Sequence, residues 1–288
     1  MKDRLNILAG FLPLCTMAML LISKSLLESG TIPKTWQTVM AIQIFVFLVP
    51  TVVGCTVSSK LFKKLPIPCK SISVREIIFT VFSGLAISLL GFWANFTVIS
   101  ALKISSDSGQ FSVPGAPWWV VLLISILIPA VFEEILFRGA MQSALAEYGT
   151  AVSIIAPAVC FSLIHIDIAN IAGSFIAGLL CGYLTYSFGS IIPAVLVHII
   201  YNSYYLIMDF LVDTYEVFGL VPYFFVTNIF LFLIFSYFAL RVLEKLILSD
   251  RVKRFEKSSI GNLIKSILGS PGVVILLLIT IMTIAYSV

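Results

Sequence analysis

Two adjacent carboxylates, Glu133 and Glu134, occur in a stretch that is otherwise apolar, since the run from Trp118 to Phe132 carries no charge. An ionised group in a bilayer costs roughly 2.5–3.5 kcal/mol even on insertion scales, so chains keep one mainly where it is paired, lines a polar cavity or performs chemistry. Arg138 follows Glu134 at i+4, the favourable order for an ion pair on a helix. Glu133 is turned about 100° away from Glu134. The spacing therefore predicts that Arg138 holds Glu134 and that Glu133 is free to handle a proton.

The chain contains only two histidines, and both occur in apolar segments with a distinctive residue four positions away. Phe161 precedes His165 at this spacing, and Asn202 follows His198. Residues four apart share one face of a helix. We therefore expect each histidine to act together with its partner.

The positions of the histidines allow their depths to be compared. Glu133 lies 16 residues before Gly149 and His165 lies 16 residues after it. Two antiparallel helices that turn at Gly149 would bring both residues to the same depth, roughly 24 Å from the turn. His198 lies only nine residues beyond Gly189, so its depth matches only if the first hairpin projects further than the second.

Each of these features also has a structural interpretation. The two glutamates with Arg138 could form an ion pair that only holds helices together, and each histidine could be a packing residue. Asn202 taken alone favours a role in bonding helices, and Phe161 favours packing that shields the site. The conjunction of six polar residues on three consecutive helices favours a functional site. A buried glutamate suits proton transfer, and Asn and His donors suit an oxygen that develops negative charge.

The composition identifies the environment of these residues. The chain of 288 residues is 60% hydrophobic and 11% charged, whereas soluble domains carry about 25% charged residues. Apolar runs long enough to cross about 30 Å of hydrocarbon recur without period-two alternation. The sequence predicts an all-α polytopic membrane protein with about 8–9 transmembrane helices and a central polar catalytic cavity. The expected helices are 5–27, 37–59, 77–100, 118–147, 151–166, 170–188, 191–211, 222–243 and 272–287.

The basic residues predict how the chain is oriented. With nine spans and a cytoplasmic N-terminus, all but three of the 18 Lys and Arg residues fall on the inner side, Arg138 included. The net charge of +4 is no nucleic-acid signal, because the basic residues lie between spans. The five cysteines show no CxxC spacing and predict neither a disulfide nor a zinc cluster. We expect one membrane domain over residues 1–288, with a core at about 115–205 and flanking spans in 1–103 and 221–288.

The motifs Glu133-Glu134-x-x-x-Arg138, Phe161-x-x-x-His165 and His198-x-x-x-Asn202, in this order, resemble those of the CPBP family. That family comprises the type II CAAX prenyl endopeptidases and the bacteriocin-processing and self-immunity ("Abi") proteins. The glycine-rich stretch 175–183 is also similar to the family, and the resemblance covers about 115–205.

The resemblance implies an intramembrane endopeptidase. By analogy, Glu133 and His165 would activate a water for attack on a peptide carbonyl, and His198 with Asn202 would stabilise the oxyanion. Glu134 and Arg138 would orient the site. A zinc set of Glu133, His165 and His198 is an alternative, but these residues lack His-Glu-x-x-His spacing. We favour a mechanism without a cofactor.

Another class of function also fits. Intramembrane Glu, Arg and His mark proton paths, so a non-catalytic immunity or regulatory scaffold or a proton-coupled transporter is an alternative. The expected partners are membrane lipid and a membrane-associated peptide or protein, possibly prenylated, with no nucleic acid. The short loops suggest a bacterial plasma-membrane protein.

Overall fold

The computed structural model describes residues 2–62, 67–103, 115–165, 167–217, 221–253 and 269–287, and throughout these ranges the regular elements are helices. Six helices are long and apolar enough to cross a membrane, and three shorter apolar helices accompany them. The protein is therefore an all-α, multi-pass membrane protein, as the sequence predicts. The six long apolar segments are Gly10–Glu28, Trp36–Val57, Val74–Leu102, Trp118–Tyr148, Ile168–Phe188 and Pro222–Leu248.

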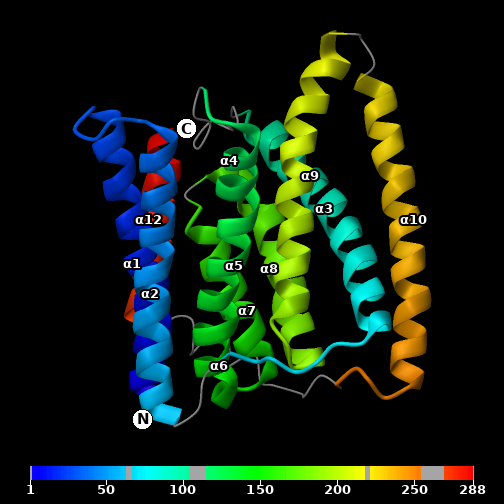
Figure 1. Cartoon of the computed structure of the whole chain (residues 1–288), viewed down its shortest axis with the longest axis horizontal. Coiled ribbons are helices and arrows are strands. Elements are labelled where there is room, and N and C mark those ends of the chain that lie inside the picture. The colour runs from blue at the N-terminus through cyan, green and yellow to red at the C-terminus, as the bar shows by residue number, and fades with distance from the viewer. Residues whose placement is uncertain are drawn as a thin grey trace.

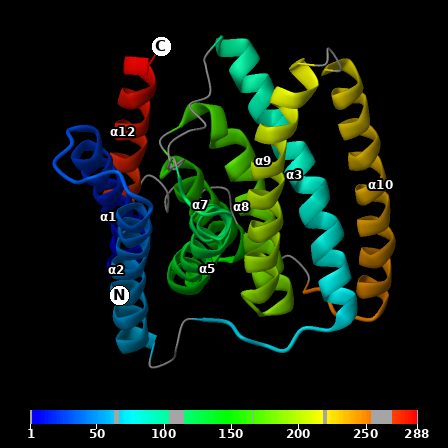
Figure 2. The same cartoon turned by 45° about the horizontal axis from the view of Figure 1, so that its top comes forward.

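The helices form three groups that follow one another across the bundle (Figure 1). One side consists of α1 (Lys2–Glu28), α2 (Trp36–Phe62) and α12 (Pro271–Ser287), in which α1 packs against both of the others. The opposite side consists of α3 (Val74–Leu102), α9 (Ile192–Val217) and α10 (Val221–Leu248). Figure 2 shows the same grouping from a second direction, with the segment after residue 117 between the two sides.

The middle group begins with a segment expected to be one continuous helix over 118–147. The structure divides it into α4 (Trp118–Leu122), η1 (Leu123–Leu127), α5 (Ile128–Glu134), η2 (Ile135–Met141), α6 (Gln142–Leu145) and η3 (Ala146–Tyr148). The η1 and η2 segments are π-helical, and η3 is a 3₁₀ turn. The π-helix is rare and is frequent at functional sites. The expectation of a regular α-helix is thus wrong over η1 and η2, and the depth calculated from a uniform rise does not apply there.

The remaining middle helices are α7 (Thr150–Leu163) and α8 (Ile168–Phe188). Gly149, with φ of 104°, begins α7, and Gly189, with φ of 65°, ends α8. A positive φ strains other residues, so these two glycines fit the two hairpin turns. The expected helix 151–166 ends three residues early, and His165 therefore lies beyond its last turn.

The glycine-rich α8 is central, as its small residues predict, because it packs against α3, α7 and α9. A Cβ at Gly173 would lie 2.9 Å from the Gly91 carbonyl oxygen, and a Cβ at Gly178 would lie 3.2 Å from Ala158 Cα. Small residues let the helix backbones approach this closely. The approach brings the polar groups of α8 within reach of the neighbouring helices.

The ends of the helices show how charge is distributed along the bundle. The end of α2, the start of α3 and the end of α10 lie at one end of the molecule (Figure 1). These segments carry Lys60, Arg75, Lys245 and Arg251. The count of basic residues placed Arg138 on the inner side of the membrane. Its side chain is instead 1% exposed inside the bundle, so Arg138 gives no information on orientation. The two basic-rich connectors at 60–75 and 241–265 are only partly within the described residues.

Candidate active site

The centre of the candidate site is the side chain of Glu134, which is fully buried in α5 and has a basic partner at each oxygen. Oε2 lies 3.1 Å from Nε of Arg138, the i+4 pair that the spacing predicts. This pair is an ion pair by distance without an aligned hydrogen bond, because Arg138 Nε is without a hydrogen-bond partner. Oε1 accepts a hydrogen bond from Nδ1 of His198 at 2.9 Å. Glu134 therefore joins its own helical segment to α9.

Glu133 is the neighbouring carboxylate, and it is 5% exposed. Its Oε2 lies 4.0 Å from Nε2 of His198. Within the described part of the chain, this oxygen accepts no hydrogen bond. A buried polar atom without a partner is uncommon and calls for an explanation, which functional sites often provide. The two adjacent acids thus face the two different nitrogens of one imidazole.

The guanidinium of Arg138 connects the π-helical segment η2 to α8. Nη2 donates to the carbonyl oxygen of Gly178 at 3.0 Å. One helical turn further along both segments, Nε2 of Gln142 donates to the carbonyl oxygen of Gly182, also at 3.0 Å. These two parallel contacts fix η2 and α6 against α8. The glycines make them possible, since a Cβ at Gly178 would lie 3.4 Å from Arg138 Nη2.

Phe161 supplies the apolar wall that several polar groups share. Its ring centroid lies 5.1 Å from that of His165 and 5.5 Å from that of His198, both in edge-on geometry. The guanidinium carbon of Arg138 lies 4.9 Å from the same centroid, within the range of a cation–π contact. Phe161 is thus in contact with three of the residues that carry the polar chemistry.

His165 lies just after α7, and its Nδ1 is 2.8 Å from the carbonyl oxygen of Phe161. A carbonyl can only accept, so Nδ1 carries the proton of the neutral ring and Nε2 keeps its lone pair. His165 is half-buried, whereas His198 is 4% exposed. The two histidines therefore differ in their exposure, although both lie against the Phe161 ring.

Asn202 is on α9, one turn after His198, and its amide reaches the middle segment. Nδ2 donates to the carbonyl oxygen of Ser125 at 3.1 Å. Ser125 is in the π-helical segment η1, where the backbone departs from the α-helical pattern. One N–H of the Asn202 amide is used in this contact, and the amide has a second N–H.

Three partners in this site were not anticipated from the sequence. They are the carbonyl groups of Ser125 and Gly178 and the side chain of Gln142. Every residue has a carbonyl, so a sequence gives no signal for the first two. Gln142 does carry a signal, because it lies four positions after Arg138 in an apolar segment.

The proposed zinc set can be compared with this arrangement. In the described part of the chain, no group of three His, Cys, Asp or Glu side chains lies close enough together to hold a metal ion. Glu133 and His198 approach each other, but His165 does not complete a three-residue set with them. These residues therefore do not fit a catalytic zinc site as they are placed, since such sites use three protein ligands.

The arrangement has the chemical features of a site for proton transfer in an apolar environment. It contains one carboxylate, Glu133, with an oxygen that accepts no hydrogen bond from the described residues, one imidazole ordered by a second carboxylate, and one imidazole ordered by a backbone carbonyl. Such fixed groups suit general acid–base chemistry and the stabilisation of developing charge.

Comparison with known proteins gives one match. The model of the family described as "Type II CAAX prenyl endopeptidase Rce1-like" matches residues 115–204. This segment extends from the residues before α4 into α9 and contains all seven residues singled out from the sequence. No curated protein and no solved structure matches the chain.

Proposed function

Because the chain belongs, over residues 115–204, to the Rce1-like family of type II CAAX prenyl endopeptidases, we propose that it hydrolyses a peptide bond through a water activated by Glu133 and His165. The family itself indicates an intramembrane CAAX-type protease in general. The observation that carries the proposal is the buried Oε2 of Glu133, which accepts no hydrogen bond from the described residues and faces His198.

The proposed reaction begins with a water molecule between Glu133 and His165. Glu133 Oε2 takes a proton from this water, and the oxygen attacks the carbonyl carbon of the scissile peptide bond. The same carboxyl then gives its proton to the leaving amine. Nε2 of His165 keeps a lone pair when Nδ1 donates to the Phe161 carbonyl, so it can accept the second hydrogen of the water.

His198 and Asn202 are proposed to stabilise the oxyanion of the tetrahedral intermediate. The Glu134 carboxylate requires a proton on Nδ1 of His198, so Nε2 can donate only when the ring is an imidazolium. Asn202 can contribute its second N–H while the first remains on the Ser125 carbonyl. Glu134 and Arg138 are thus positioning residues, since each acts through His198 or through the helix contacts.

A mechanism without metal is the one that we propose, because Glu133, His165 and His198 do not form a three-ligand set. The test is the response of peptidase activity to a tight chelator such as 1,10-phenanthroline, together with metal analysis of the purified protein. Activity that persists with less than one metal ion per chain supports the proposal. Loss of activity that added Zn²⁺ restores would contradict it.

The substrate that we propose is a membrane-associated peptide or protein, in line with the family. Prenylation of the substrate, a plasma-membrane location in a bacterium and a cytoplasmic N-terminus are further parts of the proposal. The orientation is supported by the gathering of Lys60, Arg75, Lys245 and Arg251 at the end of the bundle that α2, α3 and α10 share. Accessibility of single introduced cysteines to a membrane-impermeant reagent would test this orientation.

The decisive experiment measures cleavage of fluorogenic reporter peptides, with and without a prenylated cysteine, by the full-length protein in lipid nanodiscs. Glu133→Ala and His165→Ala are each expected to lower kcat roughly 10²–10⁴-fold, the usual contribution of a general base. The matched control is Glu147→Ala, which removes an exposed carboxylate from the end of the same segment. It should retain wild-type activity.

The outcome also separates the enzyme from the other class of function. If Glu133→Ala and His165→Ala fold like the wild type and keep full cleavage or full biological effect, the peptidase proposal is wrong. A scaffold or a proton-coupled transporter would then account better for the buried charges.

A further inference from the structure

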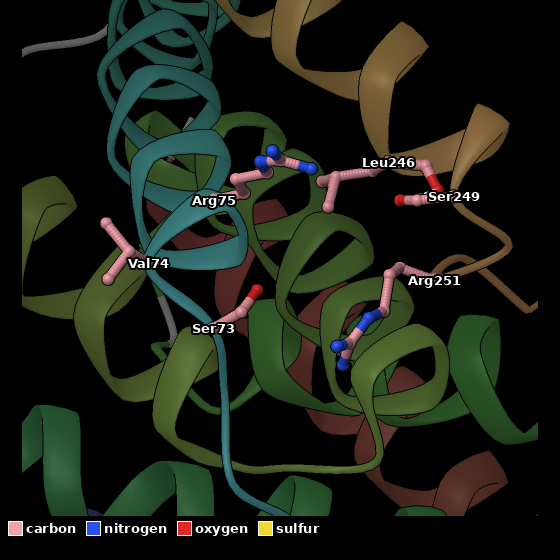
Figure 3. A pocket seen from close by; sticks show the side chains of 6 residues that line it. All are labelled: Ser73, Val74, Arg75, Leu246, Ser249 and Arg251. Carbon is pink, nitrogen blue, oxygen red and sulfur yellow. Dashed lines mark hydrogen bonds between the residues drawn. The ribbon is translucent and has the colours of Figure 1, made fainter.

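A second polar feature lies at the basic end of the bundle, away from the residues of the candidate active site. It is a pocket of about 540 Å³ between the start of α3 and the end of α10. None of its residues belongs to α5, η2, α7 or α9, which carry the site described above. The lining residues are Ser73, Val74, Arg75, Leu246, Ser249 and Arg251, and Figure 3 shows their side chains around one common space.

The backbone at the end of α10 accounts for the position of Arg251. The N–H of Arg251 donates to the Leu246 carbonyl, and the N–H of Asp250 donates to the Ile247 carbonyl, each at 3.0 Å. Asp250 has a φ of 51°, in the left-handed region that reverses the chain after a helix. Leu246 is fully buried and anchors this last turn. The reversal turns Arg251 toward the start of α3.

The start of α3 forms the other side of the pocket. Ser73 is the N-cap of the helix: its hydroxyl accepts from the Glu76 N–H, and the Glu76 carboxylate accepts from the Ser73 N–H. Helix N-termini carry a partial positive charge. Arg75 extends from the first turn of α3 toward α10 in Figure 3. The pocket therefore receives positive charge from two arginines and from the helix end.

The arginines of the pocket are not neutralised by neighbouring acids. Among the described residues, neither Arg75 nor Arg251 forms an ion pair, and the pocket lining contains no acidic side chain. Glu76 is buried and occupied by the helix cap. Glu244 pairs instead with Arg241, at 2.6 Å. Two guanidinium groups without an ion pair suit the oxygens of a phosphate group, which arginine binds in a forked geometry. The Ser73 hydroxyl accepts from the Glu76 N–H and can still donate, whereas the Ser249 hydroxyl donates to carbonyls of α10 and only lines the pocket.

The surroundings of the pocket indicate where such a phosphate comes from. Apolar side chains next to it are open to the membrane: Val74 is 70% exposed, and Leu248 is 80% exposed. Ile77, Ile78 and Ile247 add to this apolar surface. A free phosphate would gain nothing from these side chains, whereas the acyl chains of a lipid can pack on them. Basic pockets at the ends of membrane spans are suited to anionic headgroups.

We propose that the pocket formed by Ser73, Arg75, Ser249 and Arg251 binds the phosphate group of an anionic phospholipid, with its acyl chains along the start of α3 and the end of α10. Binding there holds the two helices together at the membrane surface. The site is separate from the peptidase site, and the proposal does not depend on the peptidase function.

The test uses the full-length protein in mixed detergent micelles with phosphatidylglycerol or phosphatidylcholine, with retained lipid counted by native mass spectrometry. The pocket variant is Arg75→Gln with Arg251→Gln. The matched control is Arg241→Gln with Lys245→Gln, which removes two exposed positive charges from the same end of α10 outside the pocket. The wild type and the control should retain phosphatidylglycerol over phosphatidylcholine. The pocket variant should lose at least about tenfold in this retention, the effect of one charge-assisted hydrogen bond.

Several outcomes would overturn the proposal. Equal retention by the pocket variant and the wild type would exclude the site, and an equal loss in the control variant would show diffuse surface charge instead. If inorganic phosphate at the same phosphate concentration displaced the lipid fully, the source would be a free phosphate and not a lipid. The single variant Arg251→Gln provides the same comparison if the double variant does not elute as the wild type does in detergent.

Discussion

Nδ1 of His198 donates to Oε1 of Glu134 at 2.9 Å, a bond between residues 64 positions apart in the chain. It fixes the imidazole of α9 against the segment that carries both carboxylates, and it leaves Nε2 facing Glu133 at 4.0 Å. The two glutamates therefore differ in their surroundings although they are adjacent: Glu134 has a basic partner within 3.1 Å of each oxygen, whereas Glu133 approaches the imidazole of His198 only to 4.0 Å.

The first prediction concerns the buried ion pair. Glu134→Gln leaves the guanidinium of Arg138, 1% exposed, without a counter-charge. Removing one partner of a buried pair costs about 3–5 kcal/mol, so the midpoint of thermal unfolding in detergent should fall markedly. Arg138→Met combined with Glu134→Gln should cost less than the sum of the two single changes, with a coupling of about 1 kcal/mol or more. If the losses in unfolding free energy of the two single variants add up to that of the double variant, Glu134 and Arg138 do not stabilise each other and the prediction is wrong.

The second prediction concerns Asn202. Asn202→Ala removes its hydrogen bond to the Ser125 carbonyl, which should cost about 1 kcal/mol of stability. If the amide also stabilises the oxyanion, kcat should fall about 10²–10³-fold with a much smaller change in KM. Steady-state kinetics and thermal unfolding on the same preparation separate the two effects. A loss of stability with unchanged kcat would leave Asn202 as a helix-bonding residue only.

The third prediction concerns the close approach at Gly178. Gly178→Ala would place a Cβ 3.2 Å from Ala158 Cα and 3.4 Å from Arg138 Nη2, so α7 and α8 must shift. Such overpacking costs about 1–3 kcal/mol, and the displaced guanidinium should lower peptidase activity as well.

The matched control for this change is Gly139→Ala, in the neighbouring π-helical segment. Its Cβ would meet Ile67 Cγ1 at 3.4 Å, an ordinary contact, and a helical alanine is favoured over glycine by roughly 0.5–1 kcal/mol. Gly139→Ala should therefore keep both stability and activity. Equal behaviour of the two variants would show that the approach of α8 is not tight at Gly178.

The fourth prediction concerns Asn95 of α3, which lies outside the family match. Its Nδ2 donates to Asn170 Oδ1 at 3.2 Å, and Asn170 Nδ2 in turn donates to Asp167 Oδ2 at 2.6 Å. Asp167 is the N-cap of α8, two residues after His165. Asn95 thus supports the turn that presents His165.

Asn95→Leu keeps the approximate volume of the side chain and removes its hydrogen bonds to Asn170, to the Tyr205 hydroxyl and from the Gly173 N–H, while the bond of Asn170 to Asp167 is retained. Displacement of a positioned group by about 1 Å can cost on the order of 10²-fold in rate, so kcat should fall while KM changes little. Thr97→Val on the same helix is the control, because its hydroxyl only bonds back to the Trp93 carbonyl of α3. An unchanged kcat in Asn95→Leu would mean that the turn at His165 is held by its local contacts alone.

The sequence was sufficient to predict the helices, because apolar length is a strong signal. The expected spans 170–188 and 222–243 correspond to Ile168–Phe188 and Val221–Leu248. The pair of Glu134 with Arg138 followed from spacing alone, since residues four apart in a helix are neighbours. These features are local, and local patterns are preserved when the chain folds.

The features that were missed depend on contacts between distant segments. The π-helical turns of η1 and η2 have no signal in composition, and η2 lies between Glu133 and Gly149, so the uniform rise used to compare depths does not hold there. The sequence left open whether His198 lies at the same depth as Glu133. The packing of α9 on α5 brings the His198 ring to both glutamates. Asn202 taken alone was expected to bond helices, and its hydrogen bond to the middle segment agrees with that; its partner, the Ser125 carbonyl, is one that no sequence pattern identifies.

The ring of Phe161 is a common neighbour of three polar groups, with its centroid 5.1 Å from that of His165, 5.5 Å from that of His198 and 4.9 Å from the guanidinium carbon of Arg138. A phenyl ring has no hydrogen-bonding group of its own, so it takes up none of the donors and acceptors around it. One apolar side chain therefore borders both histidines and the arginine, and a smaller residue at this position would remove a neighbour from all three at once.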